Sequence, residues 1–456
     1  MLEGKKCLII GSGISGIGAA RLLSDYDTEI TIYDSNEKLT PESITEKLPA
    51  GIKVNCITGE LPENVEMETE ALILSPGVPT DLPLVNRMRE RGVQILGEIE
   101  LAYLAEKGRV AAITGTNGKT TTTTLLGEIV KAWIGEDRTF VVGNIGNPYT
   151  LEASKTKEDS VTVAEISSFQ LETIHTFQPA VSAILNITPD HLNRHHTMEA
   201  YVAAKEAVAQ NQTKDEICVL NYENDYTRDF GERCPARPVF FSSRRELEEG
   251  YFLRGNRIIK RFGGKEQDLM DIKSDMELVG LHNAENVMAA IAMADGLGVP
   301  MEITLQTIRG FKAVEHRIEY VATKNGVVYY NDSKGTNPDA AIQGIKAMDR
   351  PTILIGGGYD KQNTYDEWIE SFDGKVKWLV LIGQTREKIA ECAKAHGITQ
   401  IKFADTFEEC LKLCTALADP GDAVLLSPAC ASWGMFPNYE TRGRLFKEYV
   451  NSLPGR

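Results

Sequence analysis

The residues best suited to chemistry lie in the stretch 109–124, RVAAITGTNGKTTTTT. An apolar run ends at Gly115, and Lys119 and Thr120 follow a second glycine at the start of a helix-compatible segment. A strand, a glycine turn and a helix start form a phosphate-binding arrangement, in which backbone N–H groups face the phosphates, the lysine reaches the outer ones and the threonine hydroxyl can ligate Mg²⁺. The full motif requires a glycine where this chain has Ile113, so its second half alone is present. The alternative is an ordinary turn after a strand, which does not require Thr-Asn-Gly-Lys-Thr.

Two more groups follow other apolar runs. Glu165 lies inside one run, and His191 comes shortly after the next. A carboxylate within a buried strand is costly unless a metal or a cation meets it. If the three strands share one sheet, Thr120, Glu165 and His191 converge near the γ-phosphate, where hard oxygen ligands suit Mg²⁺ and a histidine can be an additional ligand. We expect His195 and His196 to form part of a solvated helix start and not to be ligands.

The amino-terminal block carries GSGISG at residues 11–16, directly after an apolar run, and a second run ends at Asp34. Glycines for a pyrophosphate and a carboxylate for a ribose are typical of dinucleotide binding. A UDP-sugar offers the same pyrophosphate, so the pattern specifies a diphosphate more than a nicotinamide. The rigid loop Ser75–Pro79 is expected at the same edge. The simpler alternative is that these loops are tight turns in a Rossmann-like domain.

The carboxy-terminal block has polar groups after its apolar runs as well. Asp332 and Lys334 follow the first of them, and Lys361 and Ser432 follow two later ones. These last two are the polar side chains best placed to hold a small anionic substrate.

The whole chain repeats a short apolar run, a polar or small-residue loop and a helical stretch, which indicates parallel sheets with crossover helices. The runs are Cys7–Ile10, Ala71–Leu74, Val110–Ile113, Val161–Ile166, Val181–Leu185, Val327–Tyr330, Thr352–Ile355, Trp378–Ile382 and Ala423–Leu426. Ligands of such sheets bind beyond the carboxyl ends of the strands, where the unusual sequences above lie. We also expect a helix to begin at Pro338 with Asn337 as its cap.

The predicted fold is α/β with three domains. They are a Rossmann-like amino-terminal domain (1–97), a central P-loop ATPase-type domain with a mostly parallel sheet (98–312) and a Rossmann-like carboxy-terminal domain (313–456). Hinges are expected near Gly97 and Gly310.

Composition limits the partners and the compartment. The chain has 456 residues, which is too long for one typical core, and a formal net charge of −16. This charge argues against nucleic acid and anionic membrane surfaces, and it requires cations to be concentrated at any phosphate site. No apolar run approaches the roughly 20 residues of a membrane span, and glycines end the first run before a signal-peptide core could form. Eight scattered cysteines without a CxxC pair favour the cytosol.

At this point the chain is identified by resemblance as a member of the Mur ligase family. The motifs that carry the resemblance are GTNGKT, GNIG, AEISSFQLE, LNITPDHL, YVAAKE, LVGLHNAENV, EHRIE, NDSKGTN, GGGYDK and LLSPACAS, and they cover all three domains. GSGISG, SSFQLE and SPACAS favour the branch that adds D-glutamate. The resemblance implies an ATP-dependent amide ligation to UDP-N-acetylmuramoyl-L-alanine through an acyl phosphate, in cytoplasmic peptidoglycan precursor synthesis. It also implies two Mg²⁺ ions and a monomer. The small-molecule partners that it implies are ATP, the UDP-substrate and D-glutamate, with no nucleic-acid or membrane partner.

The resemblance assigns roles residue by residue. Catalytic roles fall to Lys119, His191, Lys205 and Lys334. ATP binding falls to Gly115, Thr116, Asn117, Gly118, Lys119, Thr120, Thr121, Thr122, Asn283, Asn286, Arg317 and Asp332. The UDP-substrate falls to Gly11, Ser12, Gly13, Asp34, Ser35, Ser75, Gly77, Asn144, Ser167, Gln170 and His191. D-Glutamate falls to Thr336, Lys361, Ser432, Trp433 and Tyr439. Metal ligands are Thr120, Glu165, His191 and Lys205, the last as a carbamate, which requires a neutral amine.

Three alternatives stay open. An NAD-dependent oxidoreductase would account for GSGISG but not for TGTNGKTT. A MurC-type, alanine-adding enzyme or a folylpolyglutamate synthase is closer, although the synthase is not expected to have the amino-terminal UDP domain. A nucleotide-binding regulatory protein would bind ATP without ligation.

Overall fold

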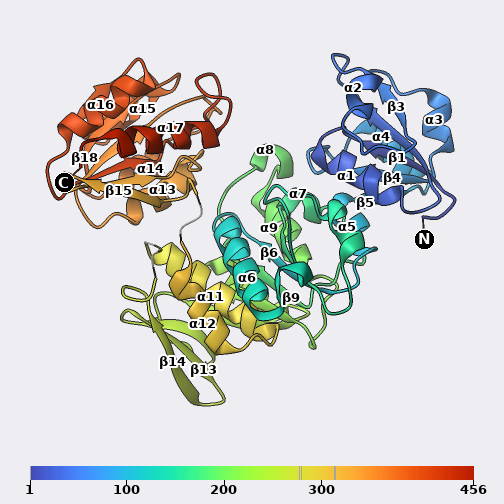
Figure 1. Cartoon of the computed structure of the whole chain (residues 1–456), viewed down its shortest axis with the longest axis horizontal. Coiled ribbons are helices and arrows are strands. Elements are labelled where there is room, and N and C mark those ends of the chain that lie inside the picture. Colours follow the sequence, from blue (N-terminus) through green and yellow to red (C-terminus); the bar gives the residue numbers. More distant parts are fainter. Residues whose placement is uncertain (1, 277, 279, 313–314, 456) are drawn as a thin grey trace. The chain divides into compact units, whose positions relative to one another are not determined.

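The computed structural model describes residues 2–276, 278, 280–312 and 315–455. They form three sheets in an α/β arrangement, as the alternating pattern predicts (Figure 1). Two compact units contain them: Met1–Asp275 with Glu285–Arg309, and Met276–Ala284 with Gly310–Arg456. The first unit holds two of the sheets and the second unit holds the third. Among the described residues, no helix is both long enough and apolar enough to cross a membrane.

The amino-terminal sheet is parallel throughout, with strand order β3-β2-β1-β4-β5. Its strands are β1 (Lys6–Ile10), β2 (Glu29–Asp34), β3 (Asn55–Thr58), β4 (Ala71–Leu74) and β5 (Gln94–Gly97). Its helices are α1 (Ile14–Leu23), α2 (Pro41–Thr45), α3 (Glu63–Glu68) and α4 (Pro83–Glu90). Alternate residues of β1 enter different clusters: Cys7 and Ile9 pack with α1, whereas Leu8 packs with Val85 and Met88 of α4. Because helices cover both faces, the central strands β1 and β4 read as nearly continuous apolar runs.

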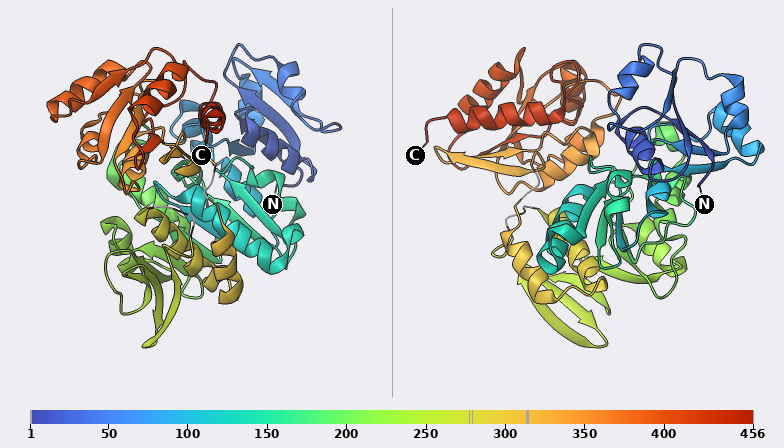
Figure 2. Two further views of the ribbon diagram at one scale, coloured as in Figure 1. Left: turned by 60° about the vertical axis from the view of Figure 1, so that its left-hand side comes forward. Right: turned by 45° about the vertical axis from the view of Figure 1, so that its right-hand side comes forward.

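The central sheet has the order β14-β13-β12-β11-β10-β9-β6-β8-β7. Its strands are β6 (Arg109–Thr114), β7 (Thr139–Gly143), β8 (Val161–Glu165), β9 (Val181–Ile184), β10 (Ile217–Asn221), β11 (Arg237–Ser242), β12 (Gly250–Arg254), β13 (Arg257–Phe262) and β14 (Lys265–Asp271). The strands from β7 to β12 are parallel, and β12, β13 and β14 pair antiparallel at one edge, where β13 and β14 extend as a hairpin (Figures 1 and 2). The alternating pattern did not predict this antiparallel edge.

The helices between and after these strands are α5 (Glu98–Tyr103), α6 (Lys119–Ile134), α7 (Ser168–Leu171), α8 (Leu192–His195), α9 (Met198–Glu206), α10 (Asp225–Arg233), α11 (Leu281–Gly296) and α12 (Met301–Gly310). Short 3-10 turns lie at Glu136–Arg138, Tyr149–Leu151, Ala153–Lys155 and Ala207–Ala209.

The carboxy-terminal sheet has the order β15-β16-β20-β17-β18-β19, parallel except for β15 with β16. Its strands are β15 (Glu319–Lys324), β16 (Val327–Asn331), β17 (Thr352–Gly356), β18 (Val376–Leu381), β19 (Ile401–Phe403) and β20 (Ala423–Leu426). Its helices are α13 (Pro338–Lys346), α14 (Asp366–Glu370), α15 (Arg386–Ala395), α16 (Phe407–Leu417) and α17 (Tyr439–Ser452). The predicted helix start is confirmed: α13 begins at Pro338, and the Asn337 side chain accepts from the Ala340 N–H.

Two buried glutamates at the start of α5 fix the chain where the amino-terminal sheet ends. Glu100 accepts hydrogen bonds from the backbone N–H groups of His175, Thr176 and Phe177 and from the Thr176 hydroxyl. Glu98 accepts from the backbone N–H and the hydroxyl of Thr150, at 2.8 and 2.9 Å. A carboxylate surrounded by N–H donors satisfies groups that burial would otherwise leave unpaired. The segment after β5 is therefore tied to two loops of the central domain.

This arrangement predicts that Glu100→Gln lowers the melting temperature. The amide replaces one acceptor oxygen with an N–H₂ that faces N–H donors, and each buried group left unpaired costs about 1–3 kcal/mol. Differential scanning calorimetry of the full chain measures the shift. Glu128→Gln is the control, since Glu128 lies exposed on α6 and pairs with Lys131 at the surface. Equal melting temperatures for the two variants would contradict the structural role of Glu100.

Candidate functional site

The turn between β6 and α6 has the backbone that a phosphate loop needs. Gly115 and Gly118 have φ angles of +145° and +89°, and Gly118 is the residue that precedes α6. A Cβ at Gly118 would lie 2.2 Å from Oδ1 of Asn286, which is closer than real contacts allow. Both backbone conformation and space therefore require glycine at position 118. The turn leads directly into the amino-terminal end of α6, and such a helix start is a typical binding place for an anion.

Side chains from the segment after β9 and from α9 hold this loop in place. The Asn117 N–H donates to Oδ1 of Asn186 at 2.8 Å, and Nδ2 of Asn186 donates back to the Asn117 carbonyl at 3.0 Å. The Thr116 hydroxyl lies 3.1 Å from both the Thr188 carbonyl and the Tyr201 hydroxyl. The loop is thus attached to the segment after β9 and to α9. Sequence analysis missed Asn186 and Tyr201 as supports of the loop.

Two lysines donate hydrogen bonds to the same loop carbonyl. Nζ of Lys119 donates to the carbonyls of Gly115 and Thr116, at 2.8 and 3.0 Å. Nζ of Lys205 donates to the Gly115 carbonyl at 2.8 Å and lies 4.6 Å from the centre of the Tyr201 ring. Burial, and then the charge of Lys119, lowers the pKa of Lys205 well below its ordinary value. This direction of shift favours the neutral form of the amine, which is the form that the predicted carbamylation requires.

Glu165 ends β8 beside the loop, in register with Ile113 of β6. It is buried, and its Oε1 accepts a hydrogen bond from Nδ2 of Asn144 at 2.8 Å. Its Oε2 is buried too and makes no hydrogen bond with any residue that the structure describes. A buried carboxylate oxygen in this state fits a divalent cation, as does the hydroxyl of Thr120 in the first turn of α6. The donor set therefore suits Mg²⁺, and Asn144 supports the carboxylate.

His191 directly precedes α8 and has a left-handed backbone, with φ of 53°. About half of its side chain is exposed, and Nε2 lies 3.5 Å from a carboxylate oxygen of Asp190. Its ring packs edge-on against Phe169, with the ring centres 4.9 Å apart. The charge of Asp190 also raises the pKa of Lys205, against the stronger effect of burial. His191 and Asp190 therefore belong to the neighbourhood of the phosphate loop.

The expectation that His195 belongs to a solvated helix start is wrong. His195 is the last residue of α8 and is buried, and its Nε2 lies 2.9 Å from the Ser168 hydroxyl. Burial lowers the pKa of His195, with the charge of Glu172 opposing it. His196 is exposed, as expected. The error arises because the fold covers one of the two adjacent side chains with α7 and α9, which local polarity cannot reveal.

A groove of about 500 Å³ lies beside the glycine turn of the amino-terminal sheet. A Cβ at Gly16 would lie 1.9 Å from the Gly11 carbonyl oxygen, so this tight turn requires glycine. Ser12 donates to Oδ2 of Asp34 through its N–H (3.0 Å) and its hydroxyl (2.6 Å). Burial opposes ionisation of Asp34, but these bonds and one from the Asn36 N–H outweigh it and lower its pKa. Asp34 is therefore held as an anion at the end of β2.

The groove contains most of the residues that we assign to the UDP-substrate. Those that line it are Gly11, Ser12, Gly13, Asp34, Ser75, Gly77, Asn144 and Gln170. Within the described part of the chain, Ser35, Ser167 and His191 do not line it. Ser167 instead caps α7 and donates its N–H to Oε1 of Gln170 at 2.9 Å, so it orients a lining residue. Glu98, which sequence analysis did not single out, also lines the groove.

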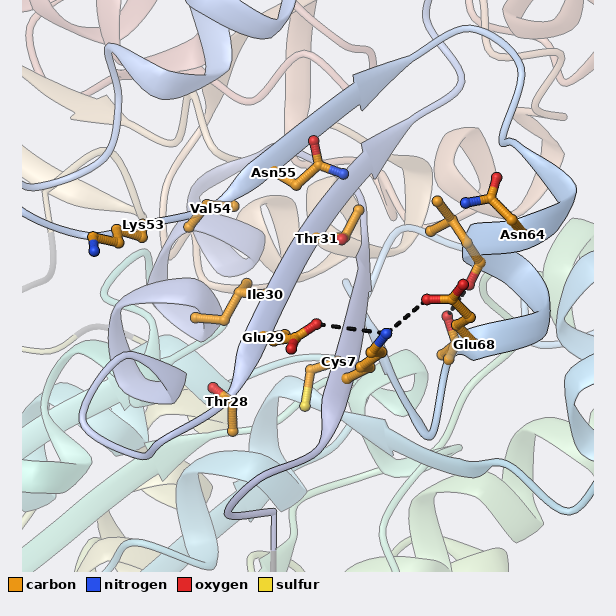
Figure 3. A pocket seen from close by; sticks show the side chains of 13 residues that line it. Cys7, Thr28, Glu29, Ile30, Thr31, Lys53, Val54, Asn55, Asn64 and Glu68 are labelled. Atoms are coloured by element: carbon orange, nitrogen blue, oxygen red, sulfur yellow. Dashed lines mark hydrogen bonds and ion pairs between the residues drawn. The ribbon is translucent and has the colours of Figure 1, made fainter.

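A second groove, of about 760 Å³, lies at the opposite end of the same strands (Figure 3). Lys6, which lines it, pairs with Glu68 at 2.7 Å and with Glu29 at 3.7 Å. Parallel sheets bind ligands beyond the carboxyl ends of their strands, whereas this groove lies at the amino ends. The groove at the glycine turn is therefore the better candidate for a substrate.

In the second compact unit, Asp332 follows β16 and is buried. Its Oδ2 accepts from the Ser427 hydroxyl at 2.7 Å, and its Oδ1 accepts from the Ile318 N–H at 3.3 Å. Burial raises the pKa of Asp332 to about 7, against the Ser427 hydrogen bond and the charge of Arg317. Nε of Arg317 is buried and has no hydrogen-bond partner among the described residues. An arginine with an unused N–H group suits an anionic or polar ligand group.

Lys334 and Tyr439 lie together in this unit. Nζ of Lys334 lies 5.8 Å from the centre of the Tyr439 ring. The Ser333 hydroxyl donates to the Tyr439 carbonyl at 2.8 Å, and the buried Arg442 donates to Ser333 at 2.9 and 2.8 Å. Burial lowers the pKa of Arg442 to about 10. Thr336 is next to this group, since its N–H donates to the Lys334 carbonyl.

Lys361 and Trp433 form a second pair, with Nζ of Lys361 5.0 Å from the indole centre. The Tyr359 N–H donates to the Ala431 carbonyl at 2.9 Å, which joins the two loops. Ser432, between Ala431 and Trp433, is buried. The structure therefore brings together the predicted glutamate-binding residues in two small groups.

The remaining residues that are predicted to bind the nucleotide lie on two helices. Thr121 and Thr122 are buried in the first turn of α6, and Asn283 and Asn286 are buried on α11. Asn286 lies directly against Gly118, so the second asparagine of the predicted pair adjoins the phosphate loop.

Comparison with known families identifies three domains along the chain. Residues 5–97 match the Mur ligase MurD-like N-terminal domain, residues 113–294 the Mur ligase middle domain, and residues 316–430 the glutamate ligase domain of Mur ligases. Curated relatives named UDP-N-acetylmuramoylalanine--D-glutamate ligase include those of Lachnoclostridium phytofermentans and Clostridioides difficile. The first is 56% identical over 99% of this chain and 98% of its own, and the second 44% identical over 99% of both.

Solved structures share the fold at lower identity. The UDP-N-acetylmuramate-alanine ligase MurC of Thermotoga maritima has a TM-score of 0.59 at 20% identity and covers 98% of this chain and 99% of its own. MurF of Acinetobacter baumannii has a TM-score of 0.61 at 17% identity, with 97% and 93% covered.

The geometry at Gly118 predicts that Gly118→Ala weakens nucleotide binding strongly. The new Cβ collides with Asn286 and strains the turn, so the loop N–H groups lose their common direction. We expect the dissociation constant for ATP to rise at least tenfold in isothermal titration. Gly135→Ala is the matched control, because Gly135 has a similar φ of +95° at the other end of α6. Equal ATP affinity in the two variants, with both folded by circular dichroism, would contradict the assignment of this loop.

Proposed function

This chain belongs to the Mur ligase family, and we propose that it is the ATP-dependent ligase that adds D-glutamate to UDP-N-acetylmuramoyl-L-alanine in peptidoglycan precursor synthesis. One observation carries the proposal: two relatives of that name match 99% of the chain, at 56% and 55% identity. The MurD-like type of the amino-terminal domain supports it. We propose domain bounds of 1–97, 98–312 and 313–456 and assign them to the UDP-substrate, to ATP and to the amino acid with part of the nucleotide.

The reaction joins two anions before it forms the amide. A carboxylate oxygen of the terminal alanine attacks the γ-phosphorus of ATP and forms an acyl phosphate. The bond between the γ-phosphorus and the β-phosphate oxygen breaks, and ADP is the leaving group. The amine of D-glutamate, once deprotonated, then attacks the acyl carbon, and inorganic phosphate leaves. Each pair of unit charges brought to about 4 Å opposes the first step by about 4 kcal/mol at an effective dielectric of about 20. Cations placed at the γ-phosphate offset this cost, most strongly as charge moves in the transition state.

The phosphate loop supplies the first of these cations. Lys119 holds its Nζ on the loop carbonyls of Gly115 and Thr116, directly beside the N–H groups of the turn. We propose that Nζ exchanges these neutral acceptors for the β- and γ-phosphate oxygens when ATP binds, because charged acceptors bind an ammonium more strongly. Asn186 keeps the loop in shape during the exchange, since it pairs with Asn117 on both sides.

We propose that Thr120, Glu165, His191 and a carbamate on Lys205 hold Mg²⁺, with two ions in the full site. Bound there, Mg²⁺ would neutralise phosphate charge and polarise the γ-phosphate. The unsatisfied Oε2 of Glu165 and the lowered pKa of Lys205 support this ligand set. A carbamate would also remove one positive charge from the pair of lysines on the Gly115 carbonyl and add a negative one.

The substrates are assigned to the two sets of strand ends. We propose that the groove at Gly11 and Asp34 holds the UDP part, with Asn144 and Gln170 toward the muramoyl end. In the carboxy-terminal domain, Lys334 would position the substrates. D-Glutamate would bind to Thr336, Lys361, Ser432, Trp433 and Tyr439. We expect the enzyme to act in the cytoplasm as a monomer, without a nucleic-acid or membrane partner.

The test of this function is phosphate release from ATP with UDP-N-acetylmuramoyl-L-alanine and a series of amino acids. We expect release with D-glutamate and little with L-alanine or L-glutamate. Lys119→Ala should lower turnover by about 10²–10³-fold or more, since it removes a charge used at the γ-phosphate. Lys131→Ala is the control on the same helix, where Lys131 pairs with Glu128 at the surface. Release with L-alanine but not D-glutamate would assign the chain to another branch of the family.

Carbamylation of Lys205 has its own test. Turnover should fall when dissolved CO₂ is removed and should recover when bicarbonate is added, because the carbamate forms from the neutral amine and CO₂. With ¹³C-labelled bicarbonate, a carbamate carbon signal should appear in the wild type and in Lys131→Ala but not in Lys205→Met. Turnover that is insensitive to CO₂, together with an absent carbamate signal, would show that Lys205 acts as an unmodified amine.

A further inference from the structure

Two short helical turns in the carboxy-terminal domain direct ligand-type side chains toward each other. Helix α14 begins with Asp366 and ends with Glu370, one helical turn later. Helix α15 carries Cys392, and His396 is its C-cap, again one turn later. Residues four apart share one face of a helix, so each turn presents a pair of side chains. These four residues have no part in the proposed ligase chemistry.

The side chains converge in the structure. A carboxylate oxygen of Asp366, Sγ of Cys392 and a ring nitrogen of His396 all lie within 4.8 Å of one another. Nε2 of His396 lies 3.1 Å from Oδ1 of Asp366, and Nδ1 lies 3.7 Å from Oε1 of Glu370. One ring nitrogen thus faces the Asp366–Cys392 side and the other faces Glu370. His396 is about one-quarter exposed and Asp366 is exposed, so the cluster is open to ions from solution.

We propose that Asp366, Cys392 and His396 bind a thiolate-preferring divalent metal ion of the zinc class, with water as the fourth ligand. Thiolate, imidazole and carboxylate are the ligands that Zn²⁺ takes in proteins, and bonds of about 2.0–2.3 Å require a small inward movement of the three side chains. On binding, the thiol loses its proton to solvent, and thiolate and carboxylate balance the two charges of the ion. Mg²⁺ does not fit this site, because it requires oxygen ligands.

Glu370 completes the arrangement as a positioning residue. Metal-bound histidines usually donate their second ring N–H to a carboxylate, which fixes the tautomer and the ring orientation. With Nε2 toward the metal, Nδ1–H of His396 points to Glu370. The alternative is a simple ion pair between His396 and two carboxylates. That alternative gives no reason for a sulfur at the same point, whereas a metal site uses all three donors.

The position of the cluster indicates what the ion would do. Asp360 precedes α14 and pairs with Lys388 of α15 at 3.4 Å. A metal between α14 and α15 would add a second connection between the same two helical segments. Because the loop that contains Lys361 leads into α14, an ion that holds α14 would also restrain the end of this loop. The role is therefore structural, and the binding test below does not depend on the ligase activity.

Cobalt spectroscopy of the metal-stripped full chain tests the proposal. Co²⁺ replaces Zn²⁺ in such sites and, when it binds a thiolate, gives a sulfur-to-metal charge-transfer band that oxygen-ligand sites lack. We expect one equivalent of Co²⁺ to produce this band together with tetrahedral d–d bands, and one equivalent of Zn²⁺ to abolish them. Co²⁺ bound at the ATP site would not contribute to this charge-transfer band, since the ligands assigned there contain no sulfur.

Variants assign the band to the cluster. Cys392→Ser should remove it and raise the dissociation constant for Zn²⁺ at least tenfold, whereas Cys56→Ser, which changes another half-buried free cysteine, should leave both unchanged. Glu370→Gln should keep the band but weaken binding by about 10- to 100-fold, as expected for a partner of the metal-bound histidine. Co²⁺ binding without a thiolate band, or a band that persists in Cys392→Ser, would overturn the proposal and leave adventitious binding at a surface histidine.

Discussion

The Gly115 carbonyl is the point on which the central site depends, because the amines of Lys119 and Lys205 both donate to it. Burial opposes a positive charge on Lys205, and the charge of Lys119 beside it adds to this effect, so the pKa of Lys205 is lowered. Anions would stabilise this arrangement of two lysines, either as bound phosphates or as a carbamate on Lys205 itself. The two lysines also concentrate positive charge at the loop for which we propose phosphate binding, although the net charge of the chain is −16.

The parallel sheets explain why these groups meet at all. Strand β6 lies between β8 and β9, so the turn after β6 has Glu165 on one side and the segment toward His191 on the other. Hydrogen bonds from Asn186 then attach that segment to the phosphate loop. The amino-terminal sheet uses the same geometry, because β1 and β2 are neighbours and their ends place the Ser12 N–H and hydroxyl on Asp34. The strand order thus determines which side chains meet, and most of these side chains lie at or just after the ends of the strands.

This dependence also decides how much the sequence can predict. The apolar runs predicted the parallel strands, and glycine, lysine and threonine spacing predicted the turn before α6, because these signals are local. The support of the loop was not predictable in the same way: Asn186 and Tyr201 lie 69 and 85 residues from their partners, and nothing near them in sequence marks the contact. The prediction for His195 failed for the same reason, since tertiary packing overrides local polarity. The mostly parallel central sheet is confirmed, but its antiparallel pairs β12–β13 and β13–β14 were not predicted. The helix start at Pro338 was predicted correctly, because a few neighbouring residues determine where a helix begins.

The two metal sites that we propose differ in the softness of their ligands, which allows both to exist in one chain. Glu165 and Thr120 offer hard oxygen atoms, which hold Mg²⁺ weakly enough for it to arrive and leave with ATP. The α14–α15 cluster offers sulfur and nitrogen, which Mg²⁺ binds poorly and zinc-class ions bind tightly. Mg²⁺ would therefore not compete for the cluster, whereas a zinc-class ion would bind it through the thiolate.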